Sequence, residues 1–203
     1  MLDERFALLG ALIVLLADGK YLVNTLKGKT RPNKVSWLIW GIAPALAFSA
    51  EFKQNVGWPS LMTLSIAIVP FLIFLGSFLN KKSQWKITKF DIFCGSLSVI
   101  GLFLWQITQV GNIAIFFGIL SDGFAFVPTY FKSWKHPESE SYSAYLGSAI
   151  SGLITLLIIK NWNFASYGFP LYIFLSCSFA FALIKFRLGI KIQKHFASSH
   201  KLV

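Results

Sequence analysis

Two carboxylic acids, Asp18 and Asp122, lie inside long apolar stretches of the sequence. A carboxylate in hydrocarbon costs roughly 2.5–3.5 kcal/mol on the insertion scale, so each should face the protein interior or a wet cavity. There it can bind a polar solute or carry a proton. The alternative is structural, because each acid can also tie its helix to a neighbour through hydroxyl or amide groups. The sequence alone leaves both interpretations open.

The two acids stand in stretches that resemble each other. The first reads ADGKYLVNTLKGKTRPNKVSWLIW from Ala17, and the second reads SDGFAFVPTYFKSWKHPESESYSAY from Ser121. With one insertion, the matched positions are Asp18-Gly19 and Asp122-Gly123, Val23 and Val127, Thr25 and Thr129, Pro32 and Pro137, Ser36 and Ser141, Trp37 and Tyr142, and Trp40 and Tyr145. Self-similarity of this kind predicts two structurally similar units.

Polar and aromatic residues near the two acids complete a candidate site. Helical spacing places Thr25 on the face of Asp18, and Thr129 on the face of Asp122. Aromatic rings pack on planar faces of solutes, and their polar atoms give direction. We predict substrate or proton binding by Asp18, Asp122, Trp40, Tyr145, Asn24, Thr25, Thr129 and Asn112. An aromatic belt at the membrane surface is the alternative for the rings, and it is favoured for Trp37 and Tyr142.

Prolines interrupt several of the predicted helices. Pro44, Pro70 and Pro128 fall inside apolar segments, and Pro170 is expected to open another. A proline within a helix frees a carbonyl group and permits bending. We predict hinges at Pro128 and Pro44, with static kinks as the alternative.

The elements that position these residues are predicted to be membrane-spanning helices. The chain is 55% hydrophobic and only 13% charged, against roughly 25% charged in soluble domains. A spanning helix needs about 20 mostly apolar residues, and the candidates are 6–26, 35–51, 58–80, 90–107, 111–131, 142–160 and 168–185. The fourth is the weakest, because Asp91 lies near its start and Gln106 and Gln109 lie near its end.

Basic residues decide the expected orientation. With seven spans, fifteen of them fall on one side, in the segments 27–34, 81–89, 132–135 and 185–201. Only Arg5, Lys53 and Lys160 fall on the other side. This bias predicts an outside N-terminus and a cytoplasmic C-terminus in a bacterial inner (plasma) membrane. It also explains the net charge of +11 without nucleic acid as a partner.

The predicted fold class is an all-α membrane protein with two three-helix repeats. Residues 1–80 form the first repeat, 81–110 the linker helix, 111–187 the second repeat, and 188–203 a basic cytoplasmic tail. A single linker helix gives both repeats the same orientation, so they are expected to be parallel and related by an axis along the membrane normal.

The arrangement of three, one and three helices resembles the PQ-loop superfamily, which includes the SWEET and SemiSWEET sugar facilitators and lysosomal exporters of the cystinosin type. The family carries a Pro-Gln dipeptide near the cytoplasmic end of the first helix of each half. The corresponding positions here read Asn24-Thr25 and Pro128-Thr129. The resemblance implies a seven-helix fold with a central pocket that opens alternately to each side, and it implies a hinge at Pro128.

These observations predict a facilitator or proton-coupled carrier for a small polar metabolite such as a sugar or an amino acid. A non-transporting seven-helix receptor or membrane assembly factor is the alternative, since folds host several functions. The expected partners are a small-molecule solute and the lipid bilayer, and the sequence leaves homo-oligomers open. No catalytic motif, cofactor site or metal-ligand spacing occurs, and the three histidines lie outside the predicted spans.

The loop before the sixth segment reads KHPESESYS and contains Glu138 and Glu140. Glu and Ser favour a helix start, so a capped turn is the expected role. A gating ion pair with the basic first loop is the weaker alternative. Cys94 and Cys177 lie in apolar segments without metal or disulfide spacing and are expected to be small buried residues.

Overall fold

The computed structural model describes residues 2–53, 58, 60–108 and 111–199, and these residues form helices without any strand. The α-helices are α1 (Phe6–Leu26), α2 (Lys34–Lys53), α3 (Ser60–Gly76), α4 (Lys89–Ile107), α5 (Gly111–Lys135), α6 (Tyr142–Ile158), α7 (Phe164–Phe186) and α8 (Leu188–Ser199). Two short 3-10 turns, η1 (Lys81–Ser83) and η2 (Pro137–Ser139), lie in the connections. The all-helical part of the fold prediction is confirmed.

Within the described residues, three helices are long and apolar enough to cross a membrane: α1, α4 and the stretch Ser166–Phe186 of α7. Shorter apolar helical stretches cover Lys34–Leu46, Thr63–Gly76 and Tyr142–Ile158. Large apolar side chains such as Leu16 on α1 and Phe103 on α4 are exposed. A protein surface that faces lipid does not have to be polar, so exposed apolar helices of this kind are typical of a membrane protein.

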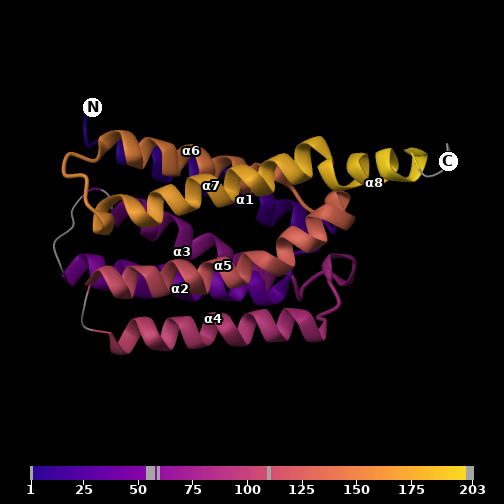
Figure 1. Cartoon of the computed structure of the whole chain (residues 1–203), viewed down its shortest axis with the longest axis horizontal. Helices are drawn as coiled ribbons and strands as arrows, with labels where there is room; N and C mark the ends of the chain where they lie inside the picture. Colours follow the sequence, from indigo (N-terminus) through magenta and orange to yellow (C-terminus); the bar gives the residue numbers. More distant parts are fainter. Residues whose placement is uncertain (1, 54–57, 59, 109–110, 200–203) are drawn as a thin grey trace.

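The helices run side by side along the long axis of the molecule, and α1 begins at the end of the bundle opposite to the end of α7 (Figure 1). Helix α1 packs against α3 and α6, whereas α5 packs against α7 and α2. Helix α4 lies outside this group, against α5 and α2. Small residues permit the close approach of α1 and α6, because Gly147 faces Ala17 and Gly10 faces Ser151.

Helix α4 begins at a capping box. The side chain of Thr88 accepts a hydrogen bond from the backbone of Asp91, and Asp91 accepts one in return from the backbone of Thr88. Asn33, just before α2, also donates to Asp91 over 2.8 Å. The acid that made this segment look weak therefore starts the helix and ties it to α2.

Helix α7 begins earlier than predicted. Asn163 is its N-cap and accepts a hydrogen bond from the backbone N–H of Ser166. Pro170 consequently lies inside the helix, and the expectation that it opens the helix is wrong. The helix begins at the polar N-cap, before the proline, because the side chain of an N-cap residue accepts hydrogen bonds from backbone N–H groups that have no partner in the first turn.

Three connections gather at one end of the bundle, which we call the basic end. The backbone N–H of Arg31 donates to the carbonyl of Ser139 over 2.8 Å. The amide of Asn80 donates to the carbonyl of Leu26 over 2.9 Å. These bonds join the connection after α1 to those after α3 and α5, and α8 extends from the same end (Figure 1).

Candidate functional site

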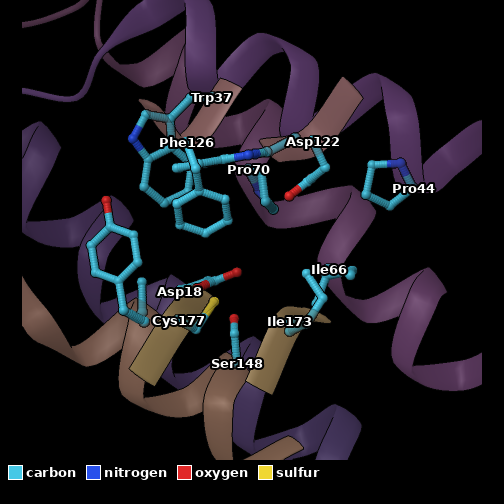
Figure 2. Close-up of a pocket in the computed structure, with 13 residues that line it drawn as sticks. Asp18, Trp37, Pro44, Ile66, Pro70, Asp122, Phe126, Ser148, Ile173 and Cys177 are labelled. Carbon is cyan, nitrogen blue, oxygen red and sulfur yellow. The ribbon is translucent and has the colours of Figure 1, made fainter. Parts of the chain in front are cut away.

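A cavity of about 50 Å³ lies between six helices in the middle of the bundle (Figure 2). Every helix of the group α1, α2, α3, α5, α6 and α7 contributes to its wall. Its lining residues are Asp18, Trp37, Trp40, Pro44, Ile66, Pro70, Asp122, Phe126, Ala144, Tyr145, Ser148, Ile173 and Cys177. Pockets for drug-sized ligands measure about 300–1,000 Å³, so this cavity is much smaller than a pocket for such a ligand.

The two acids of the repeated stretches meet at this cavity. Asp18 on α1 is 3% exposed and Asp122 on α5 is 2% exposed. Asp122 accepts a hydrogen bond of 2.7 Å from the hydroxyl of Tyr172 on α7. Among the residues that the structure describes, no hydrogen bond is recorded for the carboxyl group of Asp18, which points into the open centre of Figure 2. The two acids therefore have different surroundings.

Aromatic rings form one wall of the cavity. The ring of Trp40 lies 5.3 Å from that of Trp37, 4.4 Å from that of Phe126 and 6.4 Å from that of Tyr145, between centroids. The indole N–H group of Trp40 is buried without a hydrogen-bond partner in the described part of the chain, whereas that of Trp37 interacts with the hydroxyl group of Tyr21. The wall thus offers ring surfaces together with one unused donor.

The structure brings together the predicted residues Asp18, Asp122, Trp40 and Tyr145, and the predicted hinge Pro44 lines the same cavity. The other predicted residues do not line it. Thr25 bonds to the carbonyl of Tyr21 and to Thr30, and Thr129 bonds to Ser36. Asn24 is half-buried, Asn112 is exposed, and Pro128 is buried elsewhere in α5. Thr25 and Thr129 each follow their acid by about two helical turns, which places them beyond the cavity.

Sequence reasoning missed two rings of the aromatic wall. Trp37 is 2% exposed and lines the cavity, so its favoured place in an aromatic belt is wrong. The signal was present, because Trp37, Trp40 and Pro44 follow a helical i, i+3, i+7 pattern. Phe126 stands one turn after Asp122 and points to the same space.

A buried ion pair lies between the cavity and the basic end. Lys132 at the end of α5 and Glu140 before α6 approach to 2.5 Å, and their side chains are 1% and 0% exposed. Lys132 also donates to the carbonyl of Arg31 in the connection after α1. Its ammonium group lies 4.8 Å from the ring centroid of Trp85. The pair therefore joins three connections of the basic end.

Two tyrosines connect this ion pair to the cavity. The hydroxyl of Tyr21 donates to Glu140 over 2.5 Å, and that of Tyr145 donates to the same oxygen over 3.2 Å. Tyr145 lines the cavity, and the ring of Tyr21 lies 4.6 Å from that of Trp37. The cavity wall and the ion pair are thus in direct contact through these two side chains. We call Lys132, Glu140, Tyr21 and Tyr145 the ion-pair cluster.

The role of Glu140 differs from the expected one. Ser141 is the N-cap of α6 and forms no capping bond with its side chain, and Glu140 is engaged by Lys132 and the tyrosines. The weaker alternative, an ion pair with the basic first loop, is not what the structure shows either, because Glu140 pairs with Lys132. The cation of the pair comes from α5, and the loop contributes the carbonyl of Arg31.

The site thus combines a small central cavity, two carboxyl groups and an ion-pair cluster that contacts the cavity wall through Tyr145. This arrangement suits binding and release of a small polar solute. No group of three or more histidine, cysteine, aspartate or glutamate side chains in the described ranges is placed to hold a metal ion. Comparisons of the chain with protein-family models, with curated proteins and with solved structures found no match, so the function has to be argued from the site.

Proposed function

We propose that the protein is a membrane carrier that moves a small polar solute by alternating access, with the central cavity as its binding site. The observation that carries this proposal is the meeting of Asp18 and Asp122 at one cavity. An acid buried inside a helical membrane bundle is by default a candidate for a solute or proton pathway. Carriers bind their solutes near the midplane, between similar halves.

The packing of the helices supports two related halves within a seven-helix membrane domain. The first helix of the first half, α1, packs on the third helix of its own half and on the second helix of the other half, namely α3 and α6. Helix α5 repeats this pattern with α7 and α2. A rotation that exchanges the halves would preserve these contacts, as expected for parallel repeats.

The size of the cavity fits a closed stage of the transport cycle. At about 50 Å³, the cavity is far smaller than the pockets of about 300–1,000 Å³ that hold drug-sized ligands. A sugar or an amino acid enters only after the wall moves apart. Pro44 and Pro70 lie in that wall and break the hydrogen bonding of α2 and α3, which lowers the cost of bending there.

The ion-pair cluster acts as the gate at the basic end, which the basic residues assign to the cytoplasm. Separating Lys132 from Glu140 without solvating them is costly, because a buried charge that loses its partner is destabilising by several kcal/mol. Entry of water from the cytoplasm solvates both charges. Opening at this end and hydration of the pair therefore occur together, which gives a gate with two discrete states.

Uptake into proteoliposomes tests the proposal. Purified protein is reconstituted and offered a panel of labelled sugars, amino acids and amines, with Asp18→Asn, Trp40→Ala and the exposed-site control Asp3→Asn beside the unmodified chain. We expect saturable uptake of at least one solute, retained in Asp3→Asn and reduced at least about tenfold in the other two.

Loss of uptake is interpreted only for variants that keep the elution profile and melting temperature of the unmodified protein. A folded protein that takes up no member of the panel at any pH or gradient contradicts the carrier proposal and favours a receptor or an assembly role. Equal uptake by Trp40→Ala and the unmodified chain removes the cavity from the pathway.

A further inference from the structure

We infer that the solute bears a positive charge, carried by an ammonium group that sits between the carboxylate of Asp18 and the aromatic wall. This inference rests on the proposed carrier function and narrows its substrate class to organic cations. It goes beyond the general expectation of a sugar or an amino acid.

The first argument is the charge of the cavity. Two of its thirteen lining residues are acids and none is Lys, Arg or His. On the side of the cavity that faces the basic end, the buried cation among the described residues is Lys132. Its Nζ already lies 2.5 Å from Oε1 of Glu140. Lys20, two residues from Asp18, is exposed. A carboxyl group buried at low dielectric either takes up a proton or binds a cation, and these residues do not supply a cation.

The second argument is the difference between the two acids. Tyr172 donates to Asp122 over 2.7 Å, so that carboxyl group has a fixed partner within the protein. Asp18 is 3% exposed, has no recorded partner in the described ranges and points into the cavity (Figure 2). A buried hydrogen-bond acceptor without a partner lowers the stability of the protein by about 1–3 kcal/mol or more relative to the same acceptor with a partner. Asp18 is therefore the group whose partner arrives with the solute.

The third argument is the aromatic wall beside Asp18. Cations are attracted to the faces of aromatic rings, most strongly to tryptophan, and such cages are typical sites for ammonium ligands. Trp37, Trp40 and Phe126 form a continuous set with centroid distances of 5.3 and 4.4 Å. The unused indole N–H group of Trp40 suits an acceptor oxygen elsewhere in the solute.

A neutral polyol fits the same wall less well. Its hydroxyl groups donate to a carboxylate, but they leave the net charge of the site uncompensated. An organic cation contacts the carboxylate of Asp18 or the aromatic rings, and it also supplies the positive charge that balances the carboxylate. The closed cavity is too small for such a solute, so binding accompanies widening of the wall.

A pair of isosteric ligands isolates the charge. Choline and its neutral carbon analogue 3,3-dimethyl-1-butanol have nearly the same shape, and tetramethylammonium tests the head group alone. Binding is measured by isothermal titration calorimetry on the full chain in lipid nanodiscs, with potassium chloride at equal ionic strength as a blank. We expect choline to bind at least about tenfold more tightly than the neutral analogue.

Two variants assign the effect to residues. Asp18→Asn keeps the shape of the side chain and removes its charge, and we expect the preference for choline to fall to within about threefold of the neutral analogue. Asp3→Asn removes an exposed acid near the chain start and is expected to keep the full preference. A circular-dichroism melt of each variant separates loss of binding from loss of folding.

The outcomes separate this inference from the carrier proposal. Equal affinity for choline and its neutral analogue, or a preference that survives in Asp18→Asn, overturns the cation class. Uptake of a neutral sugar driven by a proton gradient and lost in Asp18→Asn overturns it too, because Asp18 then carries a proton, but it leaves the carrier in place. Absence of all uptake overturns both.

Discussion

Residue scale. The two acids of the repeat have the same sequence context but different partners. Their burial was predictable, because an Asp-Gly pair in the middle of an apolar stretch has to turn away from lipid. The hydrogen-bond partner of Asp122 was not predictable from the sequence. Tyr172 is fifty residues away, and only the packing of α5 against α7 brings it close. Trp37 was misplaced for a related reason, because distance from a helix end does not say whether a ring faces lipid or the bundle.

The hydrogen bond between Tyr172 and Asp122 provides a test at this scale. Tyr172→Phe leaves the buried carboxyl group without its recorded donor, so we expect the free energy of unfolding to fall by about 1–3 kcal/mol. Tyr167→Phe on the same helix is the control, since no side-chain hydrogen bond is recorded for that hydroxyl within the described ranges. Denaturant titration in mixed micelles measures both, and equal stability of the two variants contradicts the assigned bond.

Element scale. Hydropathy located the helices well because lipid imposes long apolar stretches, and each predicted span overlaps a helix of the structure. The ends were less predictable, because local caps set them. Asn163 starts α7 before Pro170, and Thr88 with Asp91 starts α4. The contact of α1 with α6 also follows no local pattern, because small residues on helices far apart in the chain meet only in the folded bundle.

The close packing of α1 against α6 predicts that two glycine-to-alanine substitutions have opposite effects on stability. A Cβ atom at Gly147 would overlap the Cβ of Ala17, which has no rotamer to escape into, whereas one at Gly19 meets nothing within 4 Å. We expect Gly147→Ala to lower the melting temperature despite the better helix propensity of alanine. Gly19→Ala should gain up to about 0.5–1 kcal/mol. Thermal unfolding followed by circular dichroism measures both variants, and a raised melting temperature of Gly147→Ala would falsify the close contact.

The ion-pair cluster joins the end of α5 to the start of α6 and is suited to a double-mutant cycle. Lys132→Met or Glu140→Gln alone leaves one buried group without its partner, and we expect each to cost about 3–5 kcal/mol. The double variant should cost less than the sum of the two, because neither charge remains. Unfolding in urea and mixed micelles measures the cycle. Additive losses would show that the two side chains do not interact.

Whole-molecule scale. The two ends of the bundle contain ion pairs with different exposure to solvent. At the basic end the ion pair is buried. At the opposite end Lys160 and Glu4 form a pair at 2.9 Å with side chains 62% and 38% exposed, and solvent screens such a pair strongly. The hydrogen bond from Lys160 to Glu4 raises the pKa of that lysine. The distribution of basic residues predicted which connections share an end, but a closed cavity depends on how rings and charges pack, which no local pattern encodes.

This asymmetry predicts that the cavity opens more readily at the end opposite the basic end. Cys177 lines the cavity, and Cys94 lies outside it on α4. In a Cys94→Ala background, a membrane-impermeant maleimide should label Cys177 mainly from the outside of oriented vesicles. Adding Glu140→Gln should raise labelling from the cytoplasmic side several-fold, because the pair that seals this end is lost. Labelling that is equal from both sides and unchanged by Glu140→Gln contradicts the gate.

The crowding of Trp37 and Trp40 in the cavity wall has an optical consequence. Indole emission shifts to longer wavelength when water reaches the ring, and nearby carboxylate charge alters its intensity. Of the seven tryptophans in the chain, these two line the cavity, next to both acids. The native chain therefore contains its own fluorophores at the point where water and solute enter. Replacing the other five with phenylalanine would leave a chain whose fluorescence follows opening and filling in real time, without an attached dye.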